Sequence, residues 1–292
     1  MKHFRKVYLE ISNICNLHCS FCPGTKREHK RMSIEEFTDL LYKLTPWTDY
    51  LYFHLMGEPL CHPNLKQFLE IADIMHFKVI LTTNGTLLEK NKRILLNAPA
   101  LHKINISLHA FEANEPGMPF EEYISDALTF AKKSADSGII TVLRLWNLDG
   151  RADGALNTKN DQILALMREH FPSEWVQTRS GYRLASRVFL EWGDKFDWPD
   201  LNGNALSDTG FCYGLRDQIG VLADGTVVPC CLDRDGDIVL GNLFDTPLAN
   251  ILATERARAI YDGFTGHECT EALCKRCMRA GYYKNVHSKK LT

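Results

Sequence analysis

The chain has 292 residues, of which 45% are hydrophobic and 24% are charged, so disordered and fibrous classes are excluded and one large domain plus a smaller one is expected. A formal net charge of −2 gives no global attraction to nucleic acids or anionic membranes. No run approaches the roughly 20 apolar residues of a membrane span, so we expect a cytoplasmic protein with no membrane partner.

Apolar runs alternate with amphipathic segments between residues 6 and 193, which predicts repeated βα units around a parallel sheet. The expected strands are 6–12, 50–56, 78–83, 103–109, 139–148 and 186–192. The expected helices are 34–44, 64–75, 89–97, 120–137 and 159–171, and Ser33 with Glu36 forms a capping box for the first. Six units are too few for a closed eight-unit barrel, so the predicted α/β fold is a partial (β/α)6 TIM-like barrel.

The sequence changes character after residue 193. Residues 197–210 are rich in Asp, Asn, Gly and Pro and predict a connector. Segments 218–223 and 226–231 flank Asp224-Gly225, which predicts a β-hairpin, and a helix is expected over 248–261. We therefore predict a barrel domain over 1–196, followed over 197–292 by the connector and a small cysteine-rich module of a hairpin plus a helix.

The chain has ten cysteines, and structural disulfides are not expected in a cytoplasmic protein, so metal ligation is the first interpretation. Cys15, Cys19 and Cys22 form a CxxxCxxC motif after the first predicted strand, with Phe21 before the last cysteine. This segment resembles the cluster loop of the radical S-adenosylmethionine (SAM) superfamily. The resemblance implies a [4Fe-4S] cluster with three thiolate ligands and one open iron that binds SAM, and places Phe21 near the adenine. A zinc site is the alternative, but structural zinc needs a fourth ligand and none is obvious nearby.

Further motifs similar to those of the superfamily follow the predicted strands. Met56-Gly57-Glu58-Pro59 resembles the GGEP motif that holds the SAM amino group, although Met56 replaces the first glycine. Asn84, in Thr-Thr-Asn-Gly, is expected at the floor of the site. The resemblance assigns Ser107 and Arg144 to the SAM carboxylate and Asn147 to the ribose; for these three, ordinary polar residues at strand ends remain the alternative.

A second group of cysteines lies near the C-terminus. Cys212, Cys230, Cys274 and Cys277 resemble the SPASM extension in its shortened twitch form, which implies one auxiliary [4Fe-4S] cluster. A zinc knuckle is the alternative. Cys231 and Cys269 are possible substitute ligands, while Cys61 is interpreted as a small buried residue or a hydrogen-atom donor.

The resemblance implies an oxidoreductase that cleaves SAM to a 5′-deoxyadenosyl radical, which abstracts hydrogen from a peptide or small-molecule substrate. A reductant such as flavodoxin or ferredoxin would supply the electron. The basic run Lys26–Arg31 leaves open an RNA- or nucleotide-modifying enzyme, and a non-catalytic metal-sulfur scaffold or redox sensor is the third hypothesis. The sequence identifies no catalytic acid or base; His109 and Asp217 are candidates only by their expected nearness to the clusters.

Overall fold

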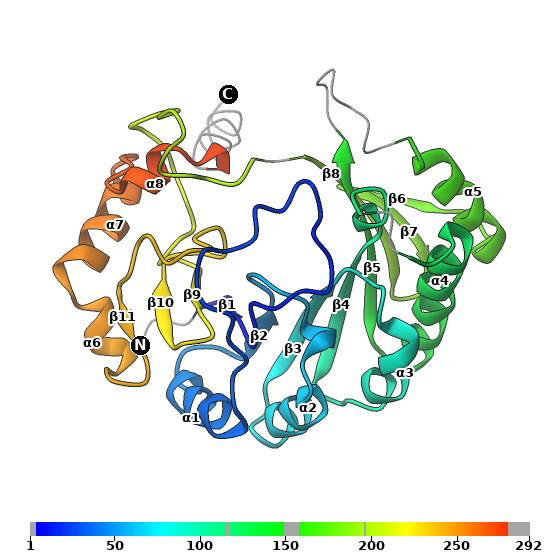
Figure 1. Ribbon diagram of the computed structural model, residues 1–292, viewed down its shortest axis with the longest axis horizontal. Helices are drawn as coiled ribbons and strands as arrows, with labels where there is room; N and C mark the ends of the chain where they lie inside the picture. Colours follow the sequence, from blue (N-terminus) through cyan, green and yellow to red (C-terminus); the bar gives the residue numbers. More distant parts are fainter. Residues whose placement is uncertain (1–3, 115–116, 149–157, 196, 280–292) are drawn as a thin grey trace. The chain divides into compact units, whose positions relative to one another are not determined.

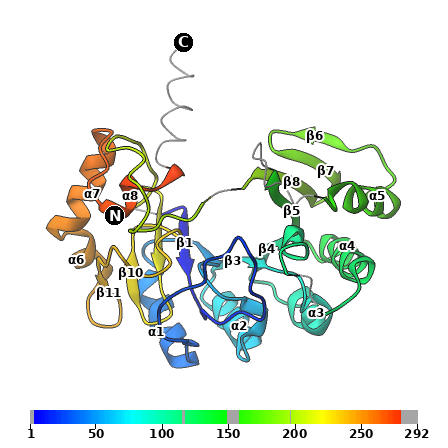
Figure 2. The same ribbon diagram turned by 45° about the horizontal axis from the view of Figure 1, so that its top comes forward.

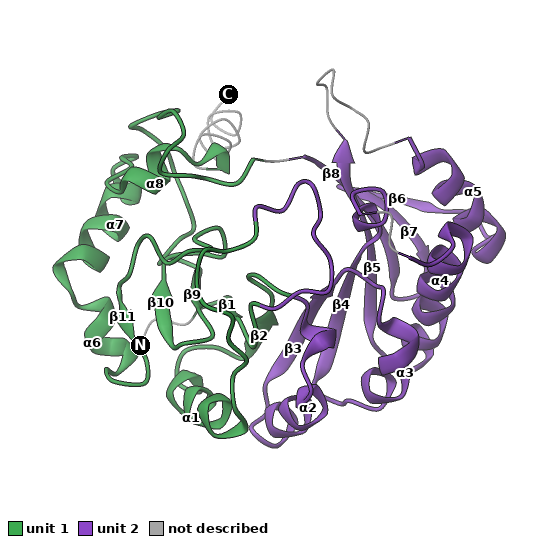
Figure 3. Ribbon diagram, viewed as in Figure 1, with its two compact units in different colours: residues 1–13, 24–57, 196–292 green, residues 14–23, 58–195 purple. Residues whose placement is uncertain are grey.

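The computed structural model describes residues 4–114, 117–148, 158–195 and 197–279. The chain divides into two compact units (Figure 3). The first unit comprises residues 1–13, 24–57 and 196–292, and the second comprises 14–23 and 58–195. Residues 14–23, here called the cysteine loop, thus belong to the second unit although the chain on both sides belongs to the first. The predicted domain boundary at residues 196 and 197 stays a prediction.

The strands of the first unit follow the order β11-β10-β9-β1-β2. Their bounds are Lys6–Leu9 for β1, Tyr50–Phe53 for β2, Gln218–Val221 for β9, Thr226–Val228 for β10 and Gly241–Asn242 for β11. β1 is parallel to both β2 and β9, and β10 is antiparallel to β9 and β11. The helices of this unit are α1 Ile34–Leu44, α6 Leu248–Leu252, α7 Glu255–Thr265 and α8 Ala272–Lys275 (Figure 1).

The strands of the second unit follow the order β3-β4-β5-β8-β7-β6. Their bounds are Lys78–Thr83 for β3, Leu101–Ser107 for β4, Ile140–Leu148 for β5, Val176–Thr178 for β6, Gly181–Ala185 for β7 and Val188–Asp194 for β8. β3, β4, β5 and β8 are parallel, whereas β6, β7 and β8 form an antiparallel meander beside α5 (Figure 2). The helices are η1 Pro59–Cys61, α2 Leu65–Ile74, α3 Leu88–Leu96, η2 Leu108–Ala110, α4 Phe120–Asp136 and α5 Asn160–His170.

The predicted fold class is confirmed: the fold is α/β, the strands are mostly parallel and neither unit's sheet closes on itself. All six predicted strands and the five helices between them are present, and α1 has the predicted bounds. Ser33 and Glu36 form the capping box, because each side chain accepts a hydrogen bond from the other residue's backbone N–H. Within the described residues, no helix has the length and apolar character needed to cross a membrane.

Two expectations about local structure were wrong or incomplete. The single helix expected over 248–261 is two helices, because Thr254 adopts an extended conformation and caps the second, accepting a hydrogen bond from Ala257 N. The β6–β7 hairpin was not predicted. Its strands are short, and the side chains of Val176 and Arg183 are exposed, so the sequence lacks the apolar alternation that marks a strand.

A buried ion pair connects separate segments of the first unit. The side chain of Glu10, just after β1, has no exposed surface and accepts two hydrogen bonds from the Arg27 guanidinium, at 2.8 and 2.7 Å. The same carboxylate accepts the backbone N–H groups of Met56, at 3.2 Å, and Ala223, at 3.1 Å. Arg27 Nε also donates to the carbonyl of Arg234. This carboxylate therefore fixes four points of the chain relative to one another.

Replacing Arg27 by alanine should lower the free energy of unfolding by about 3–5 kcal/mol, because it leaves the buried Glu10 charge unpaired. The matched control is Lys30→Ala, from the same basic run, whose ion pair with Glu36 is partly exposed and should be worth less than about 1 kcal/mol. Urea unfolding of the full chain at pH 7 measures both values. Equal losses in the two variants would contradict the structural role assigned to Glu10.

Candidate functional site

The cysteine loop holds Cys15, Cys19 and Cys22 in a compact turn. The backbone N–H of Cys22 donates to the carbonyl of Cys19 at 2.8 Å, and the N–H of Leu17 points at Cys15 Sγ from 3.4 Å. Partial removal from water raises the pKa of the Cys15 thiol to about 11, and also raises the pKa of Cys19. Both thiols are therefore protonated at neutral pH, and a metal that binds there must displace protons.

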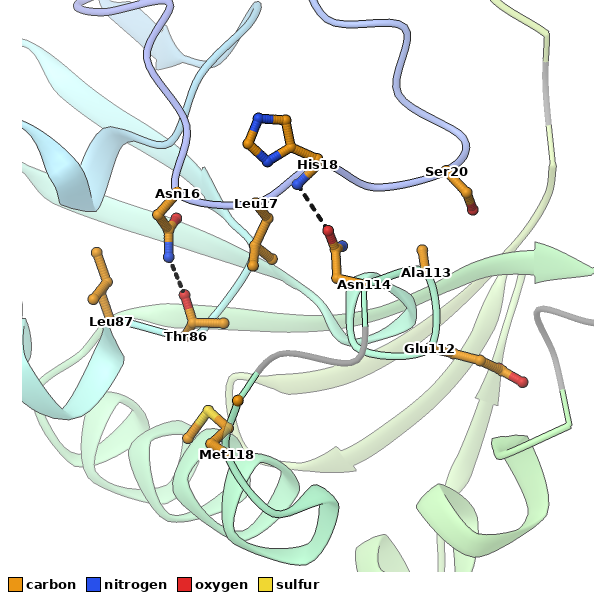
Figure 4. Close-up of a pocket in the computed structure, with 11 residues that line it drawn as sticks. Asn16, Leu17, His18, Ser20, Thr86, Leu87, Glu112, Ala113, Asn114 and Met118 are labelled. Carbon is orange, nitrogen blue, oxygen red and sulfur yellow. Dashed lines mark hydrogen bonds between the residues drawn. The ribbon is translucent and has the colours of Figure 1, made fainter.

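One side of the cysteine loop is held by Asn84, directly after β3. Its Nδ2 donates to Asn16 Oδ1 at 2.9 Å and lies 3.9 Å from Cys15 Sγ. Asn16 Nδ2 in turn donates to Thr86 Oγ1 at 2.8 Å (Figure 4). Thr86 closes the set by donating its backbone N–H and hydroxyl to Asn84 Oδ1, at 3.0 and 2.7 Å. The predicted Thr-Thr-Asn-Gly segment thus contacts the cysteine loop itself.

The other side of the cysteine loop is held by Asn114, which the sequence analysis missed. Its Nδ2 donates to Cys19 Sγ and to the carbonyl of Ala110, both at 2.9 Å. Its Oδ1 accepts the backbone N–H of His18 at 2.8 Å (Figure 4). Asn114 lies in the loop after η2, outside any strand end or recognised motif, so only the three-dimensional structure identifies it.

Beside the cysteine loop the second unit has a pocket of about 920 Å³. Its wall is formed by residues 16–18 and 20 of the cysteine loop, by 86–87, and by 112–114 and 117–118 (Figure 4). The predicted SAM-binding residues Phe21, Glu58, Asn84, Ser107, Arg144 and Asn147 are not among them. The pocket therefore borders the cysteine loop without coinciding with the predicted SAM contacts.

Glu58 is turned into the protein. Its side chain accepts hydrogen bonds from Leu60 N at 3.0 Å and from Thr83 Oγ1 and Asn84 N, each at 2.7 Å, and the residue is 2% exposed. Burial raises its pKa to about 7, although the three donors oppose this shift. In this conformation the carboxylate joins the turn after β2 to the turn after β3, and both of its oxygens are bonded within the protein.

Ser107 and Arg144 are directly opposite each other on the neighbouring strands β4 and β5, as the predicted SAM carboxylate clamp requires. Arg144 Nε donates to Glu191 Oε2 at 3.2 Å, and Glu191 is its partner on β8. The guanidinium also lies over the ring of Trp146, with Cζ 4.2 Å from the ring centroid. Glu191 and Trp146 were not predicted, and together they hold Arg144 in one orientation.

Phe21 packs against His109, with the ring centroids 5.1 Å apart. Burial, together with the charge of Arg144, lowers the pKa of His109 to about 4, so its imidazole is neutral at pH 7. Asn147 pairs with Asn160: its Nδ2 donates to Asn160 Oδ1 at 3.0 Å, and its Oδ1 accepts from Asn160 Nδ2 at 3.2 Å.

Gly57, in the first unit, has a conformation that requires glycine. Its φ is +77°, and a Cβ atom there would lie 2.3 Å from the carbonyl oxygen of Ser12. The turn after Met56 therefore runs directly against the backbone that follows β1. Asp217, the other candidate acid or base, lies just before β9, where its backbone carbonyl accepts the N–H of Lys6.

The four predicted auxiliary cysteines lie together in the first unit. Cys212, Cys230, Cys274 and Cys277 all line one small cavity, whose wall is completed by apolar residues that include Phe264 and Leu273. Burial raises the pKa of Cys212 to about 12 and that of Cys230 well above its ordinary value, and the neighbouring thiols add to the Cys230 shift. Within the described residues, no three His, Cys, Asp or Glu side chains converge closely enough to hold a single metal ion.

The remaining cysteines lie outside that cavity. Cys231 packs against the apolar cluster around Tyr8 and Tyr52, and its thiol hydrogen-bonds to the Tyr8 hydroxyl. Cys269 is 3% exposed and does not line the cavity. Cys61, in η1 of the second unit, is half-buried and adds to the rise in the pKa of Cys15.

Residues of the basic run Lys26–Arg31 form ion pairs and hydrogen bonds within the first unit. Arg27 binds Glu10, and Lys30 Nζ bonds Glu36 at 2.6 Å. The backbone N–H of Lys26 donates to Asp235 Oδ1 at 2.8 Å, which attaches the run to the segment after Cys231. The cationic side chains of Arg27 and Lys30 are thus neutralised locally, which weakens the case for a phosphate-binding patch.

Two family profiles match the chain. The profile described as the radical SAM superfamily matches residues 9–158, which is 150 of the 292 residues. A second, described as an iron-sulfur cluster-binding domain (SPASM), matches residues 212–278. The first profile spans the cysteine loop and the predicted SAM contacts, and the second spans all four cysteines around the small cavity.

Curated relatives share limited identity with the chain. A probable GTP 3′,8-cyclase of Methanococcus maripaludis is 32% identical over 118 residues, and this match covers only 39% of each protein. A GTP 3′,8-cyclase of Microcystis aeruginosa is 24% identical over 87% of this chain and 90% of its own length. The sporulation killing factor maturation protein SkfB of Bacillus subtilis is 22% identical, covering 83% of this chain and 63% of that protein.

Solved structures share the fold. SuiB of Streptococcus suis, bound to S-adenosylmethionine, superposes with a TM-score of 0.62 at 16% identity, covering 98% of this chain and 75% of that one. BtrN in complex with AdoMet and 2-DOIA gives a TM-score of 0.57 at 18% identity, covering 95% and 94%. At these identities the likeness establishes the architecture.

Glu58 should make the stability of the apoprotein depend on pH. Burial raises its pKa from 4.5 to about 7, so the folded state holds the proton more tightly than the unfolded state. The protonated Glu58 carboxyl therefore stabilises the folded state by about 3 kcal/mol. This stabilisation is complete below pH 4.5 and is lost as the pH rises through about 7. Urea unfolding from pH 4.5 to 8 measures the free energy of unfolding of the wild type and of Glu58→Gln. The value for the wild type should fall relative to that of the variant as the pH rises. A constant difference between the two proteins across this range would contradict the prediction.

Proposed function

Because the chain belongs to the radical SAM superfamily, we propose that it cleaves SAM reductively and uses the 5′-deoxyadenosyl radical to abstract hydrogen from a peptide or a small molecule. Its radical SAM domain binds a [4Fe-4S] cluster and SAM, and its second domain binds iron-sulfur. The observation that carries the proposal is the cysteine loop, which carries all three thiols and is held on its two sides by Asn84 and Asn114.

In this proposal Cys15, Cys19 and Cys22 ligate the SAM cluster. Three thiolates leave one iron of a [4Fe-4S] cube without a protein ligand, which is the coordination position that SAM requires. The donor set fits such a cluster, since the Leu17 N–H and the Asn114 amide already point at thiol sulfurs and would stabilise the negative charge of bound thiolates.

Residues of the second unit would orient SAM. Arg144 presents a guanidinium that suits the SAM carboxylate, and Ser107 lies beside it on the neighbouring strand. Phe21, packed on His109, offers an aromatic surface for the adenine. The amino group would be received at the turn Gly57-Glu58 by backbone carbonyls, since the Glu58 carboxylate is bonded elsewhere. Asn84 would support the cysteine loop, and Asn147 would contact the ribose.

The four cysteines around the small cavity of the first unit would ligate one auxiliary [4Fe-4S] cluster. Cys212, Cys230, Cys274 and Cys277 line the same small cavity, and four thiolates complete the coordination of a cubane. Such a cluster would accept the second electron of an oxidation or orient the substrate. A reductant such as flavodoxin or ferredoxin would supply the first electron.

The substrate would be polar, at least where it meets the second unit. Trp146 Nε1 and Asn105 Oδ1 are buried and, within the described part of the chain, have no hydrogen-bond partner. Both residues lie on the face of β4 and β5 that carries Ser107 and Arg144, because each is two positions away along its strand. Buried polar groups are normally paired, so a ligand with complementary donors and acceptors would complete them.

The names of the related proteins specify different classes of substrate, so they do not identify the substrate class of this chain. Several are GTP 3′,8-cyclases, one is a 2-deoxy-scyllo-inosamine dehydrogenase, and SuiB has been solved bound to a precursor peptide. These names cover a nucleotide, a small molecule and a peptide. The proposal therefore stays at a polar small molecule or peptide.

Anaerobically reconstituted protein, reduced with dithionite, should cleave SAM to 5′-deoxyadenosine and contain about eight irons per chain, four in each cluster. Replacing Cys15, Cys19 and Cys22 with alanine should abolish cleavage and remove about half of the iron. Replacing the four cavity cysteines should remove the other half and leave SAM-binding spectra intact, whereas Cys231→Ala should lose no iron, because its thiol lies on Tyr8. Bound zinc without SAM cleavage would overturn the proposal.

Arg144→Ala should weaken the binding of SAM by about 10- to 100-fold, as expected for the loss of a charge-assisted hydrogen bond, and barely change the binding of decarboxylated SAM. Arg183→Ala is the matched control, because that arginine is exposed on β7. Equilibrium binding to the oxidised holoenzyme measures both ligands. Equal losses for the two ligands would show that Arg144 does not bind the carboxylate.

A further inference from the structure

Asn114 hydrogen-bonds to the cysteine loop through both the nitrogen and the oxygen of its side-chain amide. Its amide nitrogen donates both to Cys19 Sγ and to the carbonyl of Ala110, at 2.9 Å each, and its amide oxygen accepts the N–H of His18 at 2.8 Å. Both ends of the side chain therefore contact the cysteine loop, at residues adjacent in sequence. One contact is to a sulfur, and the other is to the backbone that carries this sulfur.

The loop that carries Asn114 is itself anchored in the core. The N–H of Asn114 donates to the carbonyl of Phe111 at 3.1 Å, and Phe111 is 7% exposed. The Phe111 ring packs against Phe120 and Tyr123, with centroids 5.2 Å away in each case. The backbone of Asn114 is consequently tied to the buried Phe111, whose ring packs against Phe120 and Tyr123.

The opposite clamp makes a much longer hydrogen bond to sulfur. Asn84 Nδ2 lies 3.9 Å from Cys15 Sγ and also donates to Asn16 Oδ1 at 2.9 Å. A donor 1.0 Å closer to sulfur (3.9 less 2.9 Å) interacts much more strongly with a thiolate. The three thiols are thus unequal, and Cys19 is the one that receives a short side-chain hydrogen bond.

We propose that Asn114 is a positioning residue that raises the reduction potential of the SAM cluster through its hydrogen bond to Cys19 Sγ. The inference rests on the proposed role of Cys19 as a cluster ligand. A donor aimed at a ligand sulfur stabilises negative charge on that sulfur, and the reduced cluster carries one more negative charge than the oxidised one. The bond therefore favours the reduced state, which is the state that must form before SAM can be cleaved.

The test is a redox titration of the reconstituted holoenzyme, followed by electron paramagnetic resonance. The signal of the SAM cluster is recognised because SAM perturbs it, while the auxiliary cluster supplies an internal reference. Asn114→Leu, similar in size but without a donor, should shift the midpoint of the SAM cluster to a more negative potential at unchanged iron content. The auxiliary midpoint should not move.

Two further variants separate the bond to sulfur from the clamping of the loop. Thr86→Val removes two hydrogen bonds on the opposite side, the one from Asn16 Nδ2 and the one to Asn84 Oδ1, and leaves the Asn114 donor to Cys19 Sγ in place. Its midpoint should therefore stay much closer to the wild-type value than that of Asn114→Leu. Asn114→Gln keeps an amide donor and should recover part of the shift. A wild-type midpoint in Asn114→Leu, or an equal shift in Thr86→Val, would overturn the inference.

Failure of the inference can be distinguished from failure of the proposed function. Cys19→Ala should lose the SAM-perturbed signal altogether. If that signal survives in Cys19→Ala, the assignment of the cluster ligands is wrong, and the role of Asn114 is wrong with it. If the signal is lost in Cys19→Ala while Asn114→Leu titrates like the wild type, the ligands stand and only the tuning role is overturned. Should Asn114→Leu incorporate no iron, Asn114→Ala supplies the same measurement, because alanine also has no side-chain donor.

Discussion

The carboxylate of Glu10 is the constraint on which the first unit depends. A buried charge is tolerated only when it is paired and fully hydrogen bonded, and Glu10 meets this requirement with donors from three distant segments. Arg27 is contributed by the chain that leaves the cysteine loop, Met56 by the turn that precedes Gly57, and Ala223 by the turn between β9 and β10. The position of each segment is therefore set by the need to satisfy one side chain.

The second unit uses buried polar groups in the same way. Glu58 connects the turns after β2 and β3, and the hydroxyl of Tyr123, fully enclosed, donates to the carbonyl of Asn84 at 2.6 Å. Asn84 and Asn114 then extend this network to the cysteine loop. Amides of the protein thus hold the cysteine loop on both sides.

The sequence predicted the parts of this architecture that local periodicity and spacing encode. Apart from β6 and β7, the strands and helices of residues 6–193 follow from apolar periodicity, and the two groups of cysteines follow from their spacing. The contacts that complete the site could not be predicted in this way. Asn114 and Cys19 are 95 residues apart, and Glu10 and Ala223 are 213 residues apart, so neither bond leaves a local pattern. The direction of a side chain is similarly hidden: Glu58 and Asn147 lie in recognised positions, yet tertiary packing turns both toward partners within the protein.

The pairing of β1 with β9 determines when the first unit can be completed during synthesis. Lys6 is aligned with Gln218, so the second neighbour of the N-terminal strand is translated 212 residues after it. At about 5–20 residues per second, β1 waits roughly 10–40 seconds on the ribosome with one edge unpaired. An unpaired strand edge is a template for association with other chains. Pairing β1 with so late a strand thus costs a period of exposure to aggregation, in which a chaperone that shields β1 would improve the yield of folded protein.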